Sequence, residues 1–159
     1  MAKIKTNVMR LLEQAHIPYE MTTYEVSDGK IDGQAVADKI GKSSEEVFKT
    51  LVAIGKSNRY YVFVIPVDLE LDLKKAAHVS GEKSIEMLPV KDLQKVTGYI
   101  RGGCSPVGMK KIFPTFIHIS AKNLERMTVS GGKIGVQVTV GPERLCTYLD
   151  ASFESITKS

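Results

Sequence analysis

The chain has 159 residues, with 22 Lys or Arg against 18 Asp or Glu, so its formal net charge is +4. This length is enough to bury a sizeable core without disulfides or metals. The two cysteines, Cys104 and Cys146, have neither the spacing of a zinc site nor that of a disulfide framework. No signal peptide or membrane-spanning run is apparent. We therefore expect a cytoplasmic protein that is not embedded in a membrane.

Helical and extended patterns alternate along the chain. Apolar residues at steps of three and four from 7 to 16 predict an amphipathic helix, which Pro18 ends. Two apolar runs, 47–55 and 60–67, flank a short polar linker and predict a β-hairpin. The other predicted elements are strands at 19–26, 84–87, 115–119, 127–130, 134–140 and near 153, and helices at 32–40, 72–79, 89–96 and 142–149.

Two glycine-rich segments stand out among these elements. Residues 99–111, YIRGGCSPVGMKK, follow no regular period, and we expect a long loop of a kind that often carries function. Gly131 and Gly132 are expected to separate the strands at 127–130 and 134–140. The mixture favours an α/β fold of the α+β type: a single domain, residues 1–159, with a mixed sheet flanked by helices.

The usual catalytic constellations are missing. The three histidines, His16, His78 and His118, show no paired spacing for a metal. No serine sits in a nucleophile elbow and no phosphate-binding P-loop is present. Cys104 and Ser105 could act as nucleophiles, but small residues in a glycine loop more often serve the turn itself. We expect no metal and no cofactor.

Three weaker features remain. Lys49, in VFKTL, starts an apolar strand, where a cation that faces inward needs an acceptor or a substrate; a solvent-facing lysine is the alternative. Gly102 and Gly103 offer unobstructed backbone amides that suit a carbonyl oxygen or a phosphate. Residues 130–133, SGGK, form a second such turn. For both glycine segments the alternative is a plain turn.

The order of these motifs resembles a known family. VFKTL at 47–51, LDLKKAA at 71–77, TGYIRGGCSPVG at 97–108 and VSGGKIG at 129–135 are similar to the YbaK/EbsC group of free-standing aminoacyl-tRNA deacylases. That group is similar in turn to the editing domain inserted in bacterial prolyl-tRNA synthetases. The resemblance extends over essentially the whole chain. It implies a compact fold with a mixed, barrel-like sheet, and clearance of cysteine mischarged on proline tRNA, with Cys-tRNA(Cys) as a further substrate.

The resemblance also implies a set of site residues. The family's essential lysine falls on Lys49 and its pocket glycine on Gly102, and these two are the expected catalytic residues. The other positions expected to contact substrate are Tyr24, Thr50, Gly103, Ser105, Pro106, Ser130 and Gln137. Relatives often carry an aspartate where Gln137 stands, so no acid or base role transfers to this position, although hydrogen bonding does.

The family account explains the missing nucleophile. Cysteine-specific members are thought to let the substrate thiol attack the aminoacyl ester and leave as a cyclic thiolactone. Backbone amides near Gly102 would then hold the carbonyl oxygen, and Lys49 would anchor the ester region or the terminal adenosine. Three alternatives stay open: water-driven editing of another residue, such as Ala-tRNA(Pro), a noncatalytic tRNA-binding module, and a general small-molecule hydrolase.

The basic residues suggest a partner. Lys74-Lys75, Arg101 and Lys110-Lys111 fall near turns where exposed cations could meet phosphates, and a solvated face is the alternative reading. The expected partner is aminoacyl-tRNA. A complex with prolyl-tRNA synthetase is implied by the family alone, and we expect a monomer.

Overall fold

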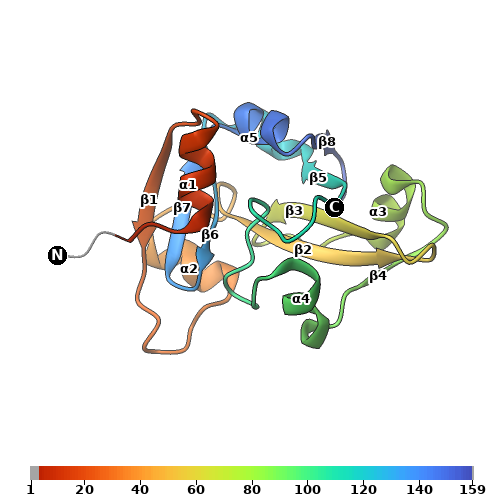
Figure 1. Ribbon diagram of the computed structural model, residues 1–159, viewed down its shortest axis with the longest axis horizontal. Helices are drawn as coiled ribbons and strands as arrows, with labels where there is room; N and C mark the ends of the chain where they lie inside the picture. Colours follow the sequence, from red (N-terminus) through yellow and green to blue (C-terminus); the bar gives the residue numbers. More distant parts are fainter. Residues whose placement is uncertain (1–3, 159) are drawn as a thin grey trace.

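The computed structural model describes residues 4–158, which form two β-sheets with short helices around them (Figure 1). The strands are β1 (Tyr19–Thr23), β2 (Phe48–Gly55), β3 (Tyr60–Pro66), β4 (Ile85–Met87), β5 (Thr115–His118), β6 (Met127–Lys133), β7 (Val136–Val140) and β8 (Ser152–Glu154). The helices are α1 (Asn7–Gln14), α2 (Gly33–Lys39), α3 (Leu73–Ser80), α4 (Val90–Thr97), the 3₁₀ helix η1 (Ile119–Asn123) and α5 (Pro142–Tyr148).

The five-stranded sheet has the order β4-β2-β3-β5-β8 and is built on the predicted hairpin. β2 and β3 pair antiparallel, while β5 runs parallel to both β3 and β8. β3 is central and buried on both faces, and its side chains alternate between two apolar clusters. Val62 and Val64 join one cluster, whereas Phe63 and Ile65 join the other. This alternation is the period of two that a strand imposes.

The three-stranded sheet has the order β1-β7-β6, with antiparallel pairing throughout. It meets the larger sheet at the start of β2, where Val47 forms a parallel bridge with Thr128 and the Thr128 amide donates to the Glu46 carbonyl at 2.8 Å. Within residues 4–158 the two sheets touch at this corner without closing into a barrel. The expected class, mixed strands flanked by helices in an α+β arrangement, is confirmed.

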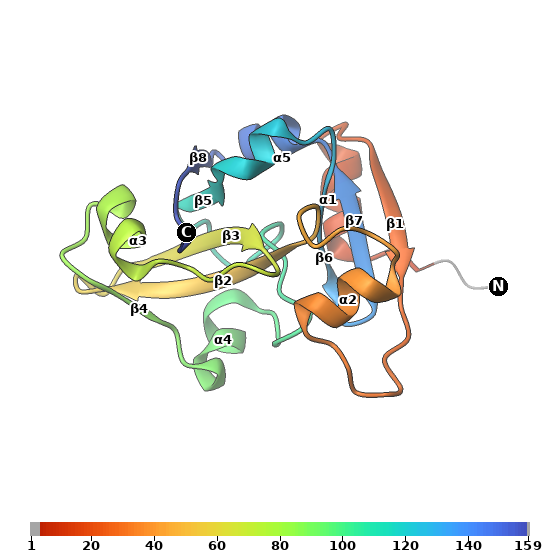
Figure 2. The ribbon, with the colours of Figure 1, turned by 180° about the vertical axis from the view of Figure 1, so that it is seen from behind.

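Helices cover the sheets from several sides. α1 lies against the three-stranded sheet in Figure 1, and α2 comes to the front in the reverse view of Figure 2. α1 buries Val8, Met9 and Leu12 in the cluster that holds the small sheet. The predicted ends of the helices follow capping chemistry: the Asp72 carboxylate accepts from two amides at the start of α3, and Gly81 ends it in the left-handed region.

Some boundaries differ from expectation. β6 runs on through Gly131 and Gly132, which form a bulge opposite β7, and the turn comes later. A Cβ on Gly131 would lie 2.8 Å from the Val136 side chain, so glycine lets the bulge pack closely. β1 stops at Thr23, three residues early, and η1 was not predicted because its five residues carry no helical period. No helix of the described chain is both long and apolar enough to cross a bilayer.

Candidate active site

Lys49 and Ser130 are brought together by the corner where the sheets meet. Each lies two residues beyond the parallel bridge between Val47 and Thr128, on strands that leave the bridge in the same direction. Alternate residues of a strand share one face, so both side chains lie on the face of the bridging pair. Two motifs 81 positions apart in the sequence are therefore neighbours in the fold.

The polar groups at the start of β2 are incompletely hydrogen bonded. The Lys49 side chain is partly buried, and its Nζ donates to the carbonyl oxygen of Val67 at 3.4 Å. The next residue, Thr50, has a buried Oγ1 with no hydrogen-bond partner in the described part of the chain. Buried polar atoms are normally paired, because each unpaired one costs desolvation free energy. Both side chains therefore have bonding capacity left, although as neighbours along β2 they project from opposite faces of the sheet, Lys49 on the face of Ser130 and Thr50 on the other.

The Gly102–Gly103 loop packs against the turn between β6 and β7. Gly102 is in the left-handed region, with φ of +88°, and a Cβ there would lie 2.9 Å from Ile31. A Cβ on Gly103 would lie 3.1 Å from the backbone nitrogen of Ile134. Both positions need glycine, the first for its backbone angle and the second because backbone approaches it closely. The loop is thereby held beside the strand that carries Ser130.

The amides of this loop are not equally available. The Gly103 amide donates to the Ile100 carbonyl at 3.0 Å, so it is already used within the loop. No acceptor among residues 4–158 takes the Gly102 amide. Ser105 and Pro106 are buried, and the Ser105 Oγ accepts from the Val107 amide at 3.2 Å. The Gly102 amide is thus free to donate to an oxyanion, whereas the Ser105 hydroxyl stabilises the shape of the loop. Substrate contact by Gly103, Ser105 and Pro106 stays a prediction.

Ser130 and Gln137 face each other across β6 and β7. They are register partners, and Gln137 also lies opposite Thr22 of β1, at the centre of the small sheet. Both side chains are buried. The Ser130 Oγ accepts from the Gly132 amide at 3.1 Å, which ties the hydroxyl to the bulge. The Gln137 side chain is a neutral amide, so its burial here requires no counter-ion.

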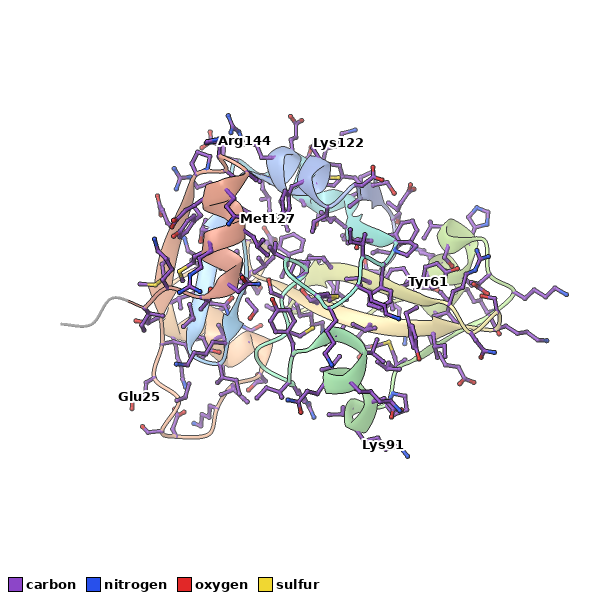
Figure 3. All side chains as sticks on the ribbon, in the orientation of Figure 1. Glu25, Tyr61, Lys91, Lys122, Met127 and Arg144 are labelled. Carbon is purple, nitrogen blue, oxygen red and sulfur yellow. The ribbon has the colours of Figure 1, made fainter. Side chains whose placement is uncertain are left out.

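Tyr24 lies just beyond β1 and begins a loop that returns to α2. Its amide donates to the Gly135 carbonyl at 3.0 Å, which places it at the β6–β7 turn. Lys39, at the end of α2, lies with Nζ 5.9 Å from the centre of the Tyr24 ring. The same Nζ donates to the Glu25 carbonyl at 2.6 Å and to the Asp28 carboxylate at 2.7 Å. Figure 3 labels Glu25 on this loop.

Lys39 is a residue that the sequence did not single out. Its hydrogen bonds fasten the loop 24–31 to α2, and that loop carries both Tyr24 and the Ile31 side chain that meets Gly102. The Lys39 hydrogen bond, ahead of an amide donated by Lys30, lowers the pKa of Asp28 and keeps this carboxylate charged. No motif marks a lysine 11 residues from its carboxylate, so only the folded loop shows the link.

The described chain offers no obvious enzyme nucleophile. Burial raises the pKa of the Cys104 thiol to about 12 and also raises that of Cys146, so both are protonated at neutral pH. The His118 imidazole is buried, and its Nδ1 accepts from the Ile156 amide at 3.3 Å. Residues 4–158 contain no group of three or more metal-ligating side chains. The predicted structural role of Cys104 agrees with its burial.

Two clefts lie elsewhere on the molecule. One, of about 360 Å³, is lined by residues that include Glu20, Arg126 and Arg144, and the other, of about 420 Å³, lies between the end of α1 and α5. Neither is lined by a predicted site residue. In the first cleft Arg126 forms an ion pair with Glu20, so this charge is already matched. We therefore place the candidate site at the sheet corner, where Lys49 and Ser130 share one face.

Comparison with known proteins agrees with the motifs. Residues 31–148 match the aminoacyl-tRNA editing domain family. The chain is 44% identical over 153 residues to EbsC of Enterococcus faecalis, named as a proposed Cys-tRNA(Pro)/Cys-tRNA(Cys) deacylase; the match covers 96% of this chain and 93% of that protein.

More distant relatives connect the chain to prolyl-tRNA synthetases. A proline–tRNA ligase of Shouchella clausii is 28% identical over 109 residues, which are 68% of this chain and 19% of the ligase. A crystal structure described as a proposed trans-editing enzyme for prolyl-tRNA synthetase has the same fold, with a TM-score of 0.82 and 20% identity over 99% of this chain and all of that one. With 44% identity to EbsC and a match over most of its length, this chain belongs to the aminoacyl-tRNA editing domain family.

Proposed function

We propose that residues 1–159 act as one editing domain that deacylates Cys-tRNA(Pro), and Cys-tRNA(Cys) as a second substrate. The observation that carries the proposal is Lys49, whose Nζ makes one long hydrogen bond and whose side chain shares a face of the sheet corner with Ser130, in a chain that belongs to an editing family. The name of EbsC supports the choice of cysteine. A cation suits the ester oxygens of a charged tRNA end.

In the proposed reaction the substrate supplies the nucleophile. The cysteinyl sulfur attacks the ester carbonyl carbon, the carbon–oxygen bond to the ribose breaks, and the thiol proton ends on the released ribose hydroxyl. The products are a cyclic thiolactone and free tRNA. The burial of Cys104 and Cys146, with their raised pKa values, supports a reaction that uses no enzyme thiolate.

The protein's task is to orient the reacting groups. The free Gly102 amide would donate to the oxyanion that develops on the carbonyl, and Lys49 would stabilise its charge. Holding the thiol against the carbonyl converts the attack into an oriented intramolecular step, which contributes several kcal/mol. Ser130, Gln137 and Tyr24 would shape the pocket, with Gln137 as a hydrogen-bonding group only.

A panel of tRNA(Pro) charged with Cys, Ala, Ser or Pro tests the substrate and the mechanism together. We expect Cys-tRNA(Pro) to be deacylated at least about 100-fold faster than Ser-tRNA(Pro), because a hydroxyl is the weaker nucleophile at neutral pH. Efficient release of serine would contradict the thiol mechanism. Fastest release of alanine would instead favour water-driven editing, and no turnover of any member would favour a noncatalytic tRNA-binding module.

The partners and the compartment follow from the same proposal. Aminoacyl-tRNA is the substrate, and prolyl-tRNA synthetase would supply selectivity for one tRNA, because a net charge of +4 supports only weak, sequence-independent contact. The similarity to part of a proline–tRNA ligase supports that partner. We propose a monomer in the cytoplasm. Gel filtration of the purified chain alone tests the monomer, and gel filtration with the synthetase tests the complex.

A further inference from the structure

The net positive charge of the chain is concentrated in one segment. Residues 88–114 contain five basic side chains and one acidic side chain, so this segment has a formal charge of +4, which is that of the whole chain. The other residues balance at 17 basic and 17 acidic. The five basic residues are Lys91, Lys95, Arg101, Lys110 and Lys111. We call them the α4–loop surface.

The fold gathers these cations and leaves them exposed. The Lys110 amide donates to the Thr97 carbonyl at 3.0 Å, and its Nζ reaches the Lys95 carbonyl at 3.5 Å, so Lys110 lies along the end of α4. All five side chains are exposed. Of these five side chains, only Lys95 forms an ion pair with a described residue, Asp92, at 3.1 Å. Figure 3 shows Lys91 at the outer edge of α4, away from the sheets.

This surface is continuous with the candidate active site. Arg101 directly precedes Gly102, and Gly103 packs against the backbone of Lys133, another exposed cation. The other basic pair noted in the sequence differs, because the Lys75 Nζ donates to the Thr157 carbonyl at 2.8 Å and is partly buried. The exposed cations that lead away from Gly102 therefore belong to the α4–loop surface.

We propose that the α4–loop surface binds the backbone phosphates of the tRNA acceptor stem while the charged 3′ end lies at Lys49 and Gly102. This rests on the proposed function. Exposed lysines and an arginine on a helix end and a loop suit a row of phosphates, and binding of this kind positions a nucleic acid without reading its bases. The surface thus holds the tRNA in register with the site, and it leaves the choice of tRNA to a partner.

A charge-neutralising triple variant tests the surface. Lys91→Gln/Arg101→Gln/Lys111→Gln removes three cations that make no ion pair with a described residue. The matched control, Lys56→Gln/Lys74→Gln/Lys83→Gln, removes three exposed cations at the far end of the hairpin and around α3. Binding of uncharged tRNA(Pro) is measured by fluorescence anisotropy over a series of salt concentrations, with circular dichroism to verify folding.

We expect the surface variant to bind tRNA about 10-fold more weakly at low salt, and its slope of log affinity against log salt to flatten by roughly 2 to 3. The control variant should stay within about 2-fold of wild type, because its sites lie outside the footprint. Equal effects of the two variants would overturn the proposal. Unchanged tRNA affinity in the surface variant would also overturn it, and would leave the surface to an acidic protein partner.

A short substrate separates this proposal from the proposed function. The cysteinyl ester of the trinucleotide CCA carries the reacting end without the stem. If both proposals hold, the surface variant loses activity on Cys-tRNA(Pro) but deacylates the short ester at the wild-type rate. If wild type deacylates neither substrate, the proposed function fails, while the binding series still decides the surface. Equal losses on both substrates would contradict a role in binding the stem.

Discussion

The polar groups at the two ends of the β2–β3 hairpin differ in how completely they are hydrogen bonded. At the far end, the Glu82 carboxylate accepts from the Ser57 amide at 3.1 Å, from the Ser57 hydroxyl at 2.5 Å and from the Tyr61 hydroxyl at 2.5 Å. At the end near β6, Lys49 makes one long hydrogen bond, and Thr50 Oγ1 makes none within the described chain. The polar groups at the far end are fully hydrogen bonded within the chain, whereas those at the end near β6 are not.

The difference separates structure from function in this molecule. The Glu82 cluster closes the hairpin, and Gly55 makes room for it, since a Cβ there would lie 2.3 Å from the Glu82 carboxyl carbon. A satisfied cluster stabilises the fold and has little left to offer a ligand. At the opposite end the unpaired Thr50 Oγ1 carries a desolvation cost, which under the proposed function a bound substrate recovers. The two ends should therefore respond to mutation in opposite ways.

The largest effect is expected at Lys49. We predict that Lys49→Ala lowers kcat/KM for Cys-tRNA(Pro) by at least about 100-fold, because under the proposed function it removes the charge that stabilises the developing oxyanion. The melting temperature should change little, since Lys49 makes one weak hydrogen bond. Lys49→Met, which keeps the apolar stem, should be as inactive as alanine. Undiminished deacylation by either variant would sink the assignment of Lys49.

Thr50→Val tests the same end of the hairpin, and we expect a smaller effect on deacylation than for Lys49→Ala. Valine keeps the shape of threonine and removes the unpaired hydroxyl, so we expect an equal or higher melting temperature. The deacylation rate should fall about 10-fold, the cost of one lost hydrogen bond to substrate. A destabilised variant with full activity would reverse the interpretation of this end. Thr50→Ser, which keeps the hydroxyl, serves as the activity control.

The Glu82 cluster should show the opposite pattern, and its effect is the smallest. Hydrogen bonds from Ser57, and then from Tyr61, lower the pKa of the Glu82 carboxyl below its ordinary value of 4.5. A lowered folded pKa stabilises the protein above pH 4.5, and this contribution is lost as the pH falls through the folded value. Glu82→Gln should therefore melt below wild type at pH 7, with a difference that shrinks below pH 4.5 and normal deacylation. A difference that is independent of pH would contradict this account.

Sequence reasoning succeeded where the physics is local. The hairpin followed from two apolar runs and a short polar linker, and α3 lies within one residue of the predicted range 72–79, between the capping residues Asp72 and Gly81. These signals involve neighbours in the chain, so they survive in any fold that contains the element. The bulge at Gly131 and Gly132 was mistaken for an interruption because two glycines look alike in a turn and in a bulge.

The site shows the same division. Motif order alone identified the family and named Lys49, Gly102 and Ser130, but it left open whether Lys49 faces solvent. The folded structure decided this point, because Lys49 is partly buried and its Nζ donates to the carbonyl oxygen of Val67, a residue distant in the sequence.

The amino-acid sequence by itself determined most of the helices and strands, the family, and the position of the net charge in residues 88–114. Only the tertiary structure decided which polar groups remain unpaired: the Gly103 amide is taken by Ile100, whereas Thr50 Oγ1 has no partner in the described chain. The physical reason is that hydrogen-bond partners are set by contacts across the fold, which local patterns do not encode.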